Sequence, residues 1–519
     1  MKPHRWAPFC VGLRIAAIGA TCAGFRAGGL ASLLGAWAAF TLLRVPLRIL
    51  CVEIALVFAA SFALTTTFAF AFASVFTLAL ALLAPESGEL PLTAMDRFFI
   101  VNDYPGLPMH SIFFLDLKDA MEEPALRKAL AAVMAEIPMA RTFVRQAPWG
   151  LERFVARRAW IDTARLIVRA ETPIEEDSAP VDAPFDLARE PPIRMILTRR
   201  RGGAPQAVLI AHHSAIDGEG GLLFLDVLMR RYHEALRSRP ASALPPIAAA
   251  SRFRDRLREK GLGYAWRMIR RHLRPFAKIG AKHATLHDDR NPQPTRPVYR
   301  LFDLAPETWR ALKGTSVAFG CSRNDLLIAA TLRACLRLVS ERGQRGPSVC
   351  VSSAVSLRKA LGLGAGFQNF LGTMILTLAP EEIERTDLPS QVARKGAELR
   401  ELDQALAYPV NLGVLTRLLP PPFLRAVLRK LDADRESFFF TCMTSTMRVT
   451  HEYEGVERVG TASSMGRRPG IGITFTITGE RVACTLEWAA PIITEPTAQL
   501  LKTRFTEELA RFVSAEAAA

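Results

Sequence analysis

Two adjacent histidines followed by an aspartate and a glycine are the residues of this chain best suited to chemistry. Residues 212–218 are HHSAIDG, and the apolar run 207–210 comes directly before them. That run is typical of a buried strand, while apolar residues at helical spacing predict a helix over 220–236. Because imidazole titrates near neutral pH, a histidine at a strand end can accept a proton from a hydroxyl, thiol or amine that attacks a carbonyl.

Two interpretations of this histidine pair are open from the residues alone. In most proteins such a pair is structural, with both rings packed or hydrogen-bonded inside the fold. The full pattern HHxxxDG is rare by chance, however, and the strand before it and the helix after it favour a functional role. Gly218 and Gly220 also remove side-chain bulk, so that a substrate or another part of the chain can pass close to the backbone.

The composition limits the class of protein. Of 519 residues, 50% are hydrophobic and 22% charged, which excludes a disordered or fibrous chain and exceeds the hydrophobicity of a plain soluble enzyme. The net charge of +16 favours an anionic partner, such as nucleic acid, lipid or a phosphorylated substrate. The eight cysteines form no CxxC pair, so we predict neither a disulfide framework nor a zinc site, and a reducing compartment.

The surplus of hydrophobic residues lies near the N-terminus. The segment 54–84 carries no charge and is longer than the ~20 residues that a helix needs to cross a bilayer. A weaker apolar segment spans 27–43, and Lys2 and Arg5 before it favour a cytoplasmic N-terminus. We therefore predict one or two transmembrane helices within 1–88, in the cytoplasmic membrane, with the remaining chain on the cytoplasmic side. A secretory signal is the alternative, but the apolar region is too long for one.

The region 251–282 has a distinct composition, in which basic residues are interleaved with aromatic and aliphatic ones. This composition is typical of a helix that lies on an anionic membrane surface. A solvated linker is the first alternative, and nucleic-acid binding is the second. Because the chain has no helix-turn-helix, zinc-finger or RNP-like pattern, we predict no nucleic-acid partner.

The sequence from about residue 90 onward indicates a mixed α/β globular protein. Apolar residues at helical spacing predict further helices over 121–137 and 322–338, and a last helix that begins at Pro496. Alternating apolar residues over 471–477 and 481–488 predict the two strands of a hairpin.

The pattern HHxxxDG is the signature of acyltransferases with the chloramphenicol-acetyltransferase-like fold, and the chain resembles that superfamily. It includes the condensation domains of nonribosomal peptide synthetases and, closest in pattern, the bacterial wax ester synthase/diacylglycerol acyltransferase family. Further segments resemble parts of these proteins: PLTAMDRFFI at 91–100, PMH at 108–110, IPMAR at 137–141, PFDL at 184–187, PPIR at 191–194, ND at 324–325, AVSLR at 354–358 and NFLG at 369–372. The PLW triplet of the wax ester synthase family is not intact, and the plant-type DFGWG motif is absent.

The resemblance implies a two-lobed α/β sandwich of the chloramphenicol-acetyltransferase-like type, preceded by the N-terminal transmembrane region. We therefore divide the chain into a membrane anchor at 1–88, a first acyltransferase lobe at 89–245, a basic linker at 246–295 and a second lobe at 296–519. The resemblance also implies that no metal or organic cofactor takes part.

The resemblance also implies roles for individual residues. His213 would be the general base, while His212 would pack against the strand or hydrogen-bond the backbone. Asp217 would be structural and pair with an arginine, for which Arg358 is the candidate, and Gly218 would support the same turn. The candidates for the substrate channel are Asn324, Asp325 and Asn369, with a helix cap as an equal alternative for the first two.

These observations lead to one main hypothesis and two alternatives. The main one is a membrane-anchored acyltransferase that moves an acyl group from acyl-coenzyme A or an acyl carrier protein to a hydroxyl or amine, with a lipid the favoured acceptor and O-acyl transfer favoured over N-acyl transfer. The first alternative is a non-catalytic module of the same fold that binds a lipid or a carrier protein. The second, a transport or signalling protein with an accessory domain, needs more membrane spans than the sequence offers.

Deleting residues 1–88 should convert a membrane-bound protein into one that is largely extracted without detergent, because the long uncharged span lies there. Fractionation of cells that express either form measures this. Truncated protein that stays in the pellet at high salt would contradict the anchor. Retention that high salt abolishes would instead indicate the region 251–282, because salt screens charge attraction and not insertion.

Overall fold

The computed structural model describes most of the chain beyond the N-terminal region. The described residues are 90–103, 106–147, 150–244, 259–261, 263–264, 283–288, 295–343, 348–401, 403–418, 421–431, 436–444, 455–463 and 469–517. The predicted anchor at 1–88 and most of the basic region at 251–282 lie outside them. Within the described residues, no helix has both the length and the apolar character needed to cross a membrane.

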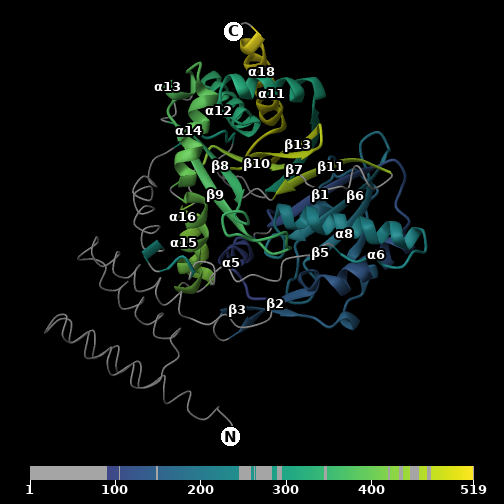
Figure 1. Cartoon of the computed structure of the whole chain (residues 1–519). Coiled ribbons are helices and arrows are strands. Elements are labelled where there is room, and N and C mark those ends of the chain that lie inside the picture. Colours follow the sequence, from purple (N-terminus) through teal and green to yellow (C-terminus); the bar gives the residue numbers. More distant parts are fainter. Residues whose placement is uncertain are drawn as a thin grey trace, which may run out of the picture.

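The first lobe is built on a five-stranded sheet in the order β11-β1-β6-β5-β4 (Figure 1). Helices α6 and α8 pack together on one face of it, over Phe113 and Leu209. Phe114 and Val208 are buried on the opposite face. Because both faces are buried, β6 carries the continuous apolar run AVLIA instead of an alternating pattern. The elements are β1 (His110–Leu117), β4 (Ile167–Arg169), β5 (Ile193–Arg199), β6 (Pro205–His212), β11 (Val456–Ser463), α6 (Glu123–Glu136) and α8 (Gly218–Leu236).

Smaller elements complete the first lobe. A hairpin of β2 and β3 follows α6, and the short helix α7 lies between β4 and β5 along the chain. The helix α5 precedes β1, and its first turn lies close to the hairpin, where Asp96 contacts Arg153 of β3. The bounds are α5 (Ala94–Val101), β2 (Thr142–Ala147), β3 (Gly150–Val155) and α7 (Ala179–Asp182).

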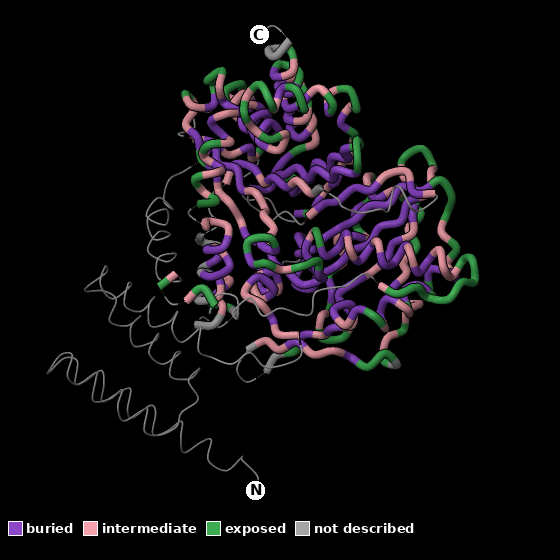
Figure 2. Tube along the Cα trace, viewed as in Figure 1, coloured by how far each residue is buried: buried purple, intermediate pink, exposed green. Residues whose placement is uncertain are grey.

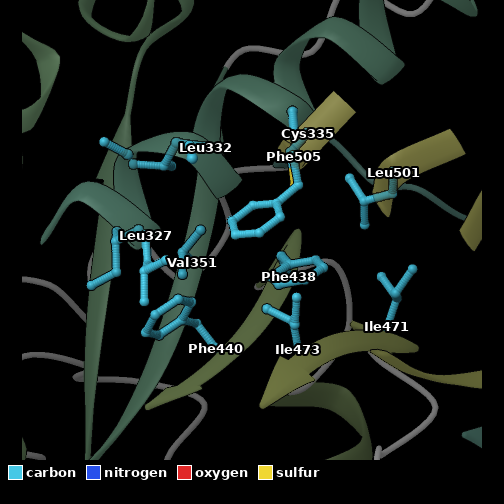
Figure 3. Packing of buried hydrophobic residues seen from close by; sticks show 14 of the residues in the cluster. Leu327, Leu332, Cys335, Val351, Phe438, Phe440, Ile471, Ile473, Leu501 and Phe505 are labelled. Carbon is cyan, nitrogen blue, oxygen red and sulfur yellow. The ribbon is translucent and has the colours of Figure 1, made fainter. Parts of the chain in front are cut away.

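The second lobe is built on a six-stranded sheet in the order β7-β13-β12-β10-β8-β9. Helices α11, α12, α14 and α18 cover it, and Figure 3 shows Leu327 and Cys335 of α12 packed with Phe438 of β10 and Phe505 of α18. The elements are β7 (Arg296–Leu304), β8 (Val349–Ser356), β9 (Leu371–Leu378), β10 (Phe438–Thr444), β12 (Ile471–Thr478), β13 (Arg481–Ala490), α11 (Pro306–Ala318), α12 (Arg323–Glu341), α13 (Pro380–Ile383), α14 (Leu388–Glu401) and α18 (Glu495–Ala517).

The two lobes are joined by a strand that crosses between them and by a helix that packs across them. Strand β11, from the C-terminal half of the chain, pairs antiparallel with β1 in the first sheet, so that Ser463 lies opposite Ser111. Helix α5 packs against α15 (Gln404–Leu418) and α16 (Pro421–Leu431), and Phe99 lies in a cluster with Leu412 and Leu424. Figure 2 shows that buried residues run through both sheets, while exposed residues gather on the outer helices and loops. The predicted domain boundaries around 246–295 stay predictions, because most of that range is not described.

The secondary structure that the sequence predicts around the site is confirmed. The apolar run 207–210 lies in β6, and α8 begins at Gly218, two residues earlier than predicted, because Asp217 caps it. The predicted hairpin is formed by β12 and β13, which pair antiparallel, with Ile471 opposite Trp488 at one end and Thr478 opposite Arg481 at the other. The mixed α/β fold in two lobes is likewise confirmed.

Candidate active site

The histidine motif lies where β6 ends and the chain turns into α8. His212 is the last residue of β6 and lies opposite His110 on β1. The amide of His213 donates to the carbonyl oxygen of Met109 at 2.8 Å, so the contact between the two chain segments extends one residue beyond the paired strands β1 and β6. The chain then turns, and Asp217 begins α8 as its N-cap.

The ring of His213 is enclosed. It stacks on the ring of Phe99 from α5, with centroids 3.9 Å apart and an interplanar angle of 11°, and His213 is 8% exposed. Burial lowers the pKa of His213 to about 4, against the opposing effect of the negative charges of Asp217 and Asp96. Within the described part of the chain, its Nδ1 makes no hydrogen bond with another residue. The imidazole is therefore neutral at physiological pH, which is the state that can accept a proton.

The ring of His212 is fully buried and contacts the turn that follows it. Its Nδ1 accepts from the amide of Ser214 at 3.1 Å and lies 2.8 Å from the hydroxyl oxygen of that residue. Its Nε2 lies 3.5 Å from a carboxylate oxygen of Asp103. Because Nδ1 accepts a hydrogen bond from an amide, the nitrogen left to carry a proton is Nε2, on the side of Asp103. The structure thus places His212 on the backbone of the turn.

Asp217 and Arg358 form a buried, bidentate ion pair. The two oxygens of Asp217 accept from Nη1 and Nη2 of Arg358 at 2.8 and 2.9 Å, and the side chains are 1% and 7% exposed. Asp217 also accepts from the amides of Gly220 at 2.8 Å and Phe370 at 2.9 Å. Arg358 in turn donates to the carbonyl oxygen of Gln368 at 2.7 Å. The carboxylate therefore binds α8 of the first lobe to the 366–370 segment of the second.

Two glycines allow this close approach. A Cβ atom at Gly220 would lie 2.7 Å from the carbonyl oxygen of Phe367. That oxygen is a backbone atom of the 366–370 segment, so it cannot simply rotate away as a side chain would. A Cβ atom at Gly218 would lie 2.3 Å from the sulfur of Met443 on β10. Gly220 therefore needs glycine for a steric reason, whereas at Gly218 the flexible side chain of Met443 can shift. φ is not positive at either position.

Asn369 contacts the backbone of the histidine turn. Its Nδ2 donates to the carbonyl oxygen of His213 and, at 3.0 Å, to Oδ1 of Asp96. The structure thus places this amide, a predicted residue of the substrate channel, in contact with the main chain of the histidine.

The sequence did not predict a role in the site for three further residues. Phe99 and Asp96 lie in the 91–100 segment that supported the resemblance, but no pattern indicated what they contact. Arg153 carried no signal at all. Its guanidinium lies 3.1 Å from Oδ2 of Asp96 and donates to the carbonyl oxygen of Ser214 at 2.5 Å.

Asn324 and Asp325 lie in the first turn of helix α12 in the second lobe. Ser322 is the N-cap of that helix, and Asp325 accepts from its amide at 2.9 Å and from its hydroxyl at 2.6 Å. This is a capping box, the alternative that the sequence left open for Asp325. The side-chain oxygen of Asn324 is buried and has no hydrogen-bond partner among the described residues. None of these contacts joins the two residues to His213.

No group of three or more histidine, cysteine, aspartate or glutamate side chains within the described residues could hold a metal ion.

No protein-family model matches the chain, and no curated protein matches it either. Solved structures do match. One is the first condensation domain of the calcium-dependent antibiotic synthetase, with a TM-score of 0.61, 18% identity, and coverage of 82% of this chain and 97% of that one. The chain has the condensation-domain fold.

Other structures with this fold carry names for different activities. Trichothecene 15-O-acetyltransferase from Fusarium sporotrichioides has a TM-score of 0.59, with 12% identity over 82% of this chain and 95% of that one. The epimerization domain of the third module of tyrocidine synthetase B has a TM-score of 0.57, with 16% identity over 83% and 98%. Identities this low establish the fold alone, so the function must be argued from the site.

The ion pair between Asp217 and Arg358 should stabilise the fold as one unit. Asp217→Ala and Arg358→Ala should each lower the free energy of unfolding by about 3–5 kcal/mol, because each leaves a buried charge unpaired. The double variant should lose little more than either single one. Thermal unfolding of the four proteins measures this, and simple addition of the two losses would contradict the coupling.

Glu219→Gln is the matched control for this cycle. Glu219 also contacts Arg358, at 3.2 Å, but its side chain is 51% exposed. Its loss should change the melting temperature little, because exposed ion pairs contribute about 0–1 kcal/mol.

Proposed function

We propose that this protein is an acyltransferase that moves an acyl group from a thioester to a hydroxyl or amine, with His213 as the general base. The observation that carries the proposal is the position of His213, whose buried ring lies on a strand-to-helix turn between the two lobes of a condensation-domain fold. The donor is acyl-coenzyme A or an acyl carrier protein, and the reaction needs no metal or organic cofactor.

The reaction needs one proton acceptor that also returns the proton. The acceptor group loses its proton to His213 as it attacks the thioester carbonyl, and a tetrahedral oxyanion forms. When this intermediate collapses, the carbon–sulfur bond breaks and the imidazolium protonates the leaving thiolate, so that ester or amide and free thiol are the products. The charges of Asp217 and Asp96 favour the imidazolium, which burial alone would disfavour. Base assistance of this kind contributes about 10²–10⁴-fold in rate.

The proposed acceptor is a lipid alcohol, and the proposed location is the cytoplasmic membrane. The uncharged segment 54–84 supports a membrane anchor, and the net charge of +16 supports binding of the phosphates of coenzyme A or of an acidic carrier protein. One similarity favours oxygen over nitrogen as the acceptor atom, namely the resemblance of the motifs to wax ester synthases.

His213→Ala should reduce acyl transfer by at least about 10²-fold while the protein stays folded, because the base is lost and the helix and strands are not. Thiol release from acyl-coenzyme A, with and without a long-chain alcohol, measures this, and the melting temperature checks the fold. His233→Ala is the control, since His233 lies in the last turn of α8, at the far end from the motif.

Turnover of His213→Ala within about tenfold of the parent would remove the residue from the role of base. A parent protein that binds acyl-coenzyme A but releases no thiol with any alcohol, amine or lipid acceptor would favour the non-catalytic binding module instead.

The dependence of kcat/KM on pH should report the lowered pKa of His213. An ordinary histidine is half protonated near pH 6.5, whereas burial lowers the pKa of His213 to about 4. Only the neutral ring accepts a proton, so kcat/KM should stay level as the pH falls through about 6.5 and should fall only below about pH 5. A half-loss near pH 6.5 in protein that is still folded would contradict this.

A further inference from the structure

Asp96 is a buried carboxylate that the proposed chemistry does not use directly. It lies in the first turn of α5 and is 1% exposed. Its Oδ2 accepts from the amide of Thr93 at 2.8 Å, while the amide of Asp96 donates to the hydroxyl of Thr93 at 3.1 Å. This reciprocal capping box explains why a helix begins here. It does not explain why the same carboxylate also faces two donors from distant parts of the chain.

Those two donors come from β3 and from the second lobe. Nη2 of Arg153 lies 3.1 Å from Oδ2 of Asp96, and Nδ2 of Asn369 donates to Oδ1 at 3.0 Å. Arg153 is almost fully buried, with 2% of its side chain exposed. Without Asp96 it would be a buried cation without its carboxylate, and Asn369 would lose one of its two acceptors.

Both donors also bind the histidine turn. Nη2 of Arg153 donates to the carbonyl oxygen of Ser214 at 2.5 Å, and Nδ2 of Asn369 donates to the carbonyl oxygen of His213. One carboxylate therefore orients two donors that hold two consecutive peptide groups, and the first of these belongs to the catalytic histidine itself.

The same helix also holds the imidazole ring. Phe99 follows Asp96 by three residues on α5 and stacks on the ring of His213 at 3.9 Å between centroids. Helix α5 thus restrains His213 in two ways, through its main-chain carbonyl by way of Asn369 and through its ring by way of Phe99. A displacement of about 1 Å in a catalytic group can cost about 10²-fold in rate.

We propose that Asp96 is a positioning residue for His213, which acts through Arg153 and Asn369 to hold the peptide groups of the histidine turn. This inference rests on the proposed function for its kinetic consequences. It does not rest on it for the placement of the ring, which can be measured without turnover.

Asp96→Asn and Thr93→Ala form a matched pair for the test. Both disturb the start of α5, but only the first removes the carboxylate that binds Arg153. Asp96→Asn should lower kcat by about 10²-fold with KM within about threefold, because substrate contacts are not removed. Thr93→Ala should lower the melting temperature through the lost cap and keep kcat within about threefold. Equal loss of kcat in both variants would overturn the proposal.

The dependence of kcat/KM on pH gives a second readout that a purely structural role would not change. The negative charge of Asp96 raises the pKa of His213, so its removal should lower that pKa further. The acidic limb of the profile should therefore move to lower pH in Asp96→Asn and stay in place in Thr93→Ala. An unmoved limb in Asp96→Asn would count against the proposal.

Asn369→Ala provides a variant that keeps the charge pair of Asp96 and Arg153 intact, in case Asp96→Asn does not fold. It should lower kcat in the same way. If both variants fold, the double variant should lose no more than the worse single one, since both act on one chain of contacts. Multiplied losses would overturn the proposed route through Asn369.

Chemical modification of His213 separates this inference from the proposed function. Diethyl pyrocarbonate acylates neutral imidazole, and mass spectrometry of the modified peptide gives the rate at His213. Asp96→Asn or Asn369→Ala should raise this rate several-fold because the ring is held less firmly, whereas Thr93→Ala should not. If the parent shows no acyl transfer, the proposed function fails and this rate still decides the inference. Unchanged rates in both variants would overturn it.

Discussion

The buried ion pair between Asp217 and Arg358 is the contact on which the arrangement of the site depends. Charges this deeply buried are stable only when each is fully paired, and the two residues stand 141 positions apart on different lobes. The histidine turn therefore reaches its final position only when the lobes have come together. The approach of the lobes also needs Gly220, because a side chain there would meet the backbone at Phe367.

The ion pair holds the helix end of the turn, and a second set of contacts holds the histidine end. Ser111 on β1 also donates to the carbonyl oxygen of Ile216 at 3.2 Å. Together with Arg153 and Asn369, it supplies side-chain donors to three carbonyls of a turn that has no regular secondary structure. A loop buried between two lobes cannot hydrogen-bond to water, so the surrounding side chains must satisfy its backbone. The donors that meet this requirement also hold the turn in place, as the proposed general base requires.

Much of the scaffold could be predicted because it depends on local patterns. The apolar run before His212 identifies a strand with two buried faces, and helical spacing identifies α8 after it. Asp325 could be predicted as a cap because its partner, Ser322, is three residues away. The crossing of β11 into the first sheet could not be predicted in this way, because strand pairing over more than 300 residues leaves no local pattern.

The candidate site divides along the same line. The sequence alone determined which histidines to consider, the turn that carries them and, through a family resemblance, the arginine that pairs with Asp217. Only the tertiary structure decided that Asn369 donates both to Asp96, 273 positions away, and to the carbonyl of His213, and that Phe99 covers the ring of that histidine. Burial, which lowers the pKa of that histidine, is also a property of the assembled lobes. The physical reason is that hydrogen bonds and desolvation act through space, whereas periodicity and capping act between near neighbours in the chain.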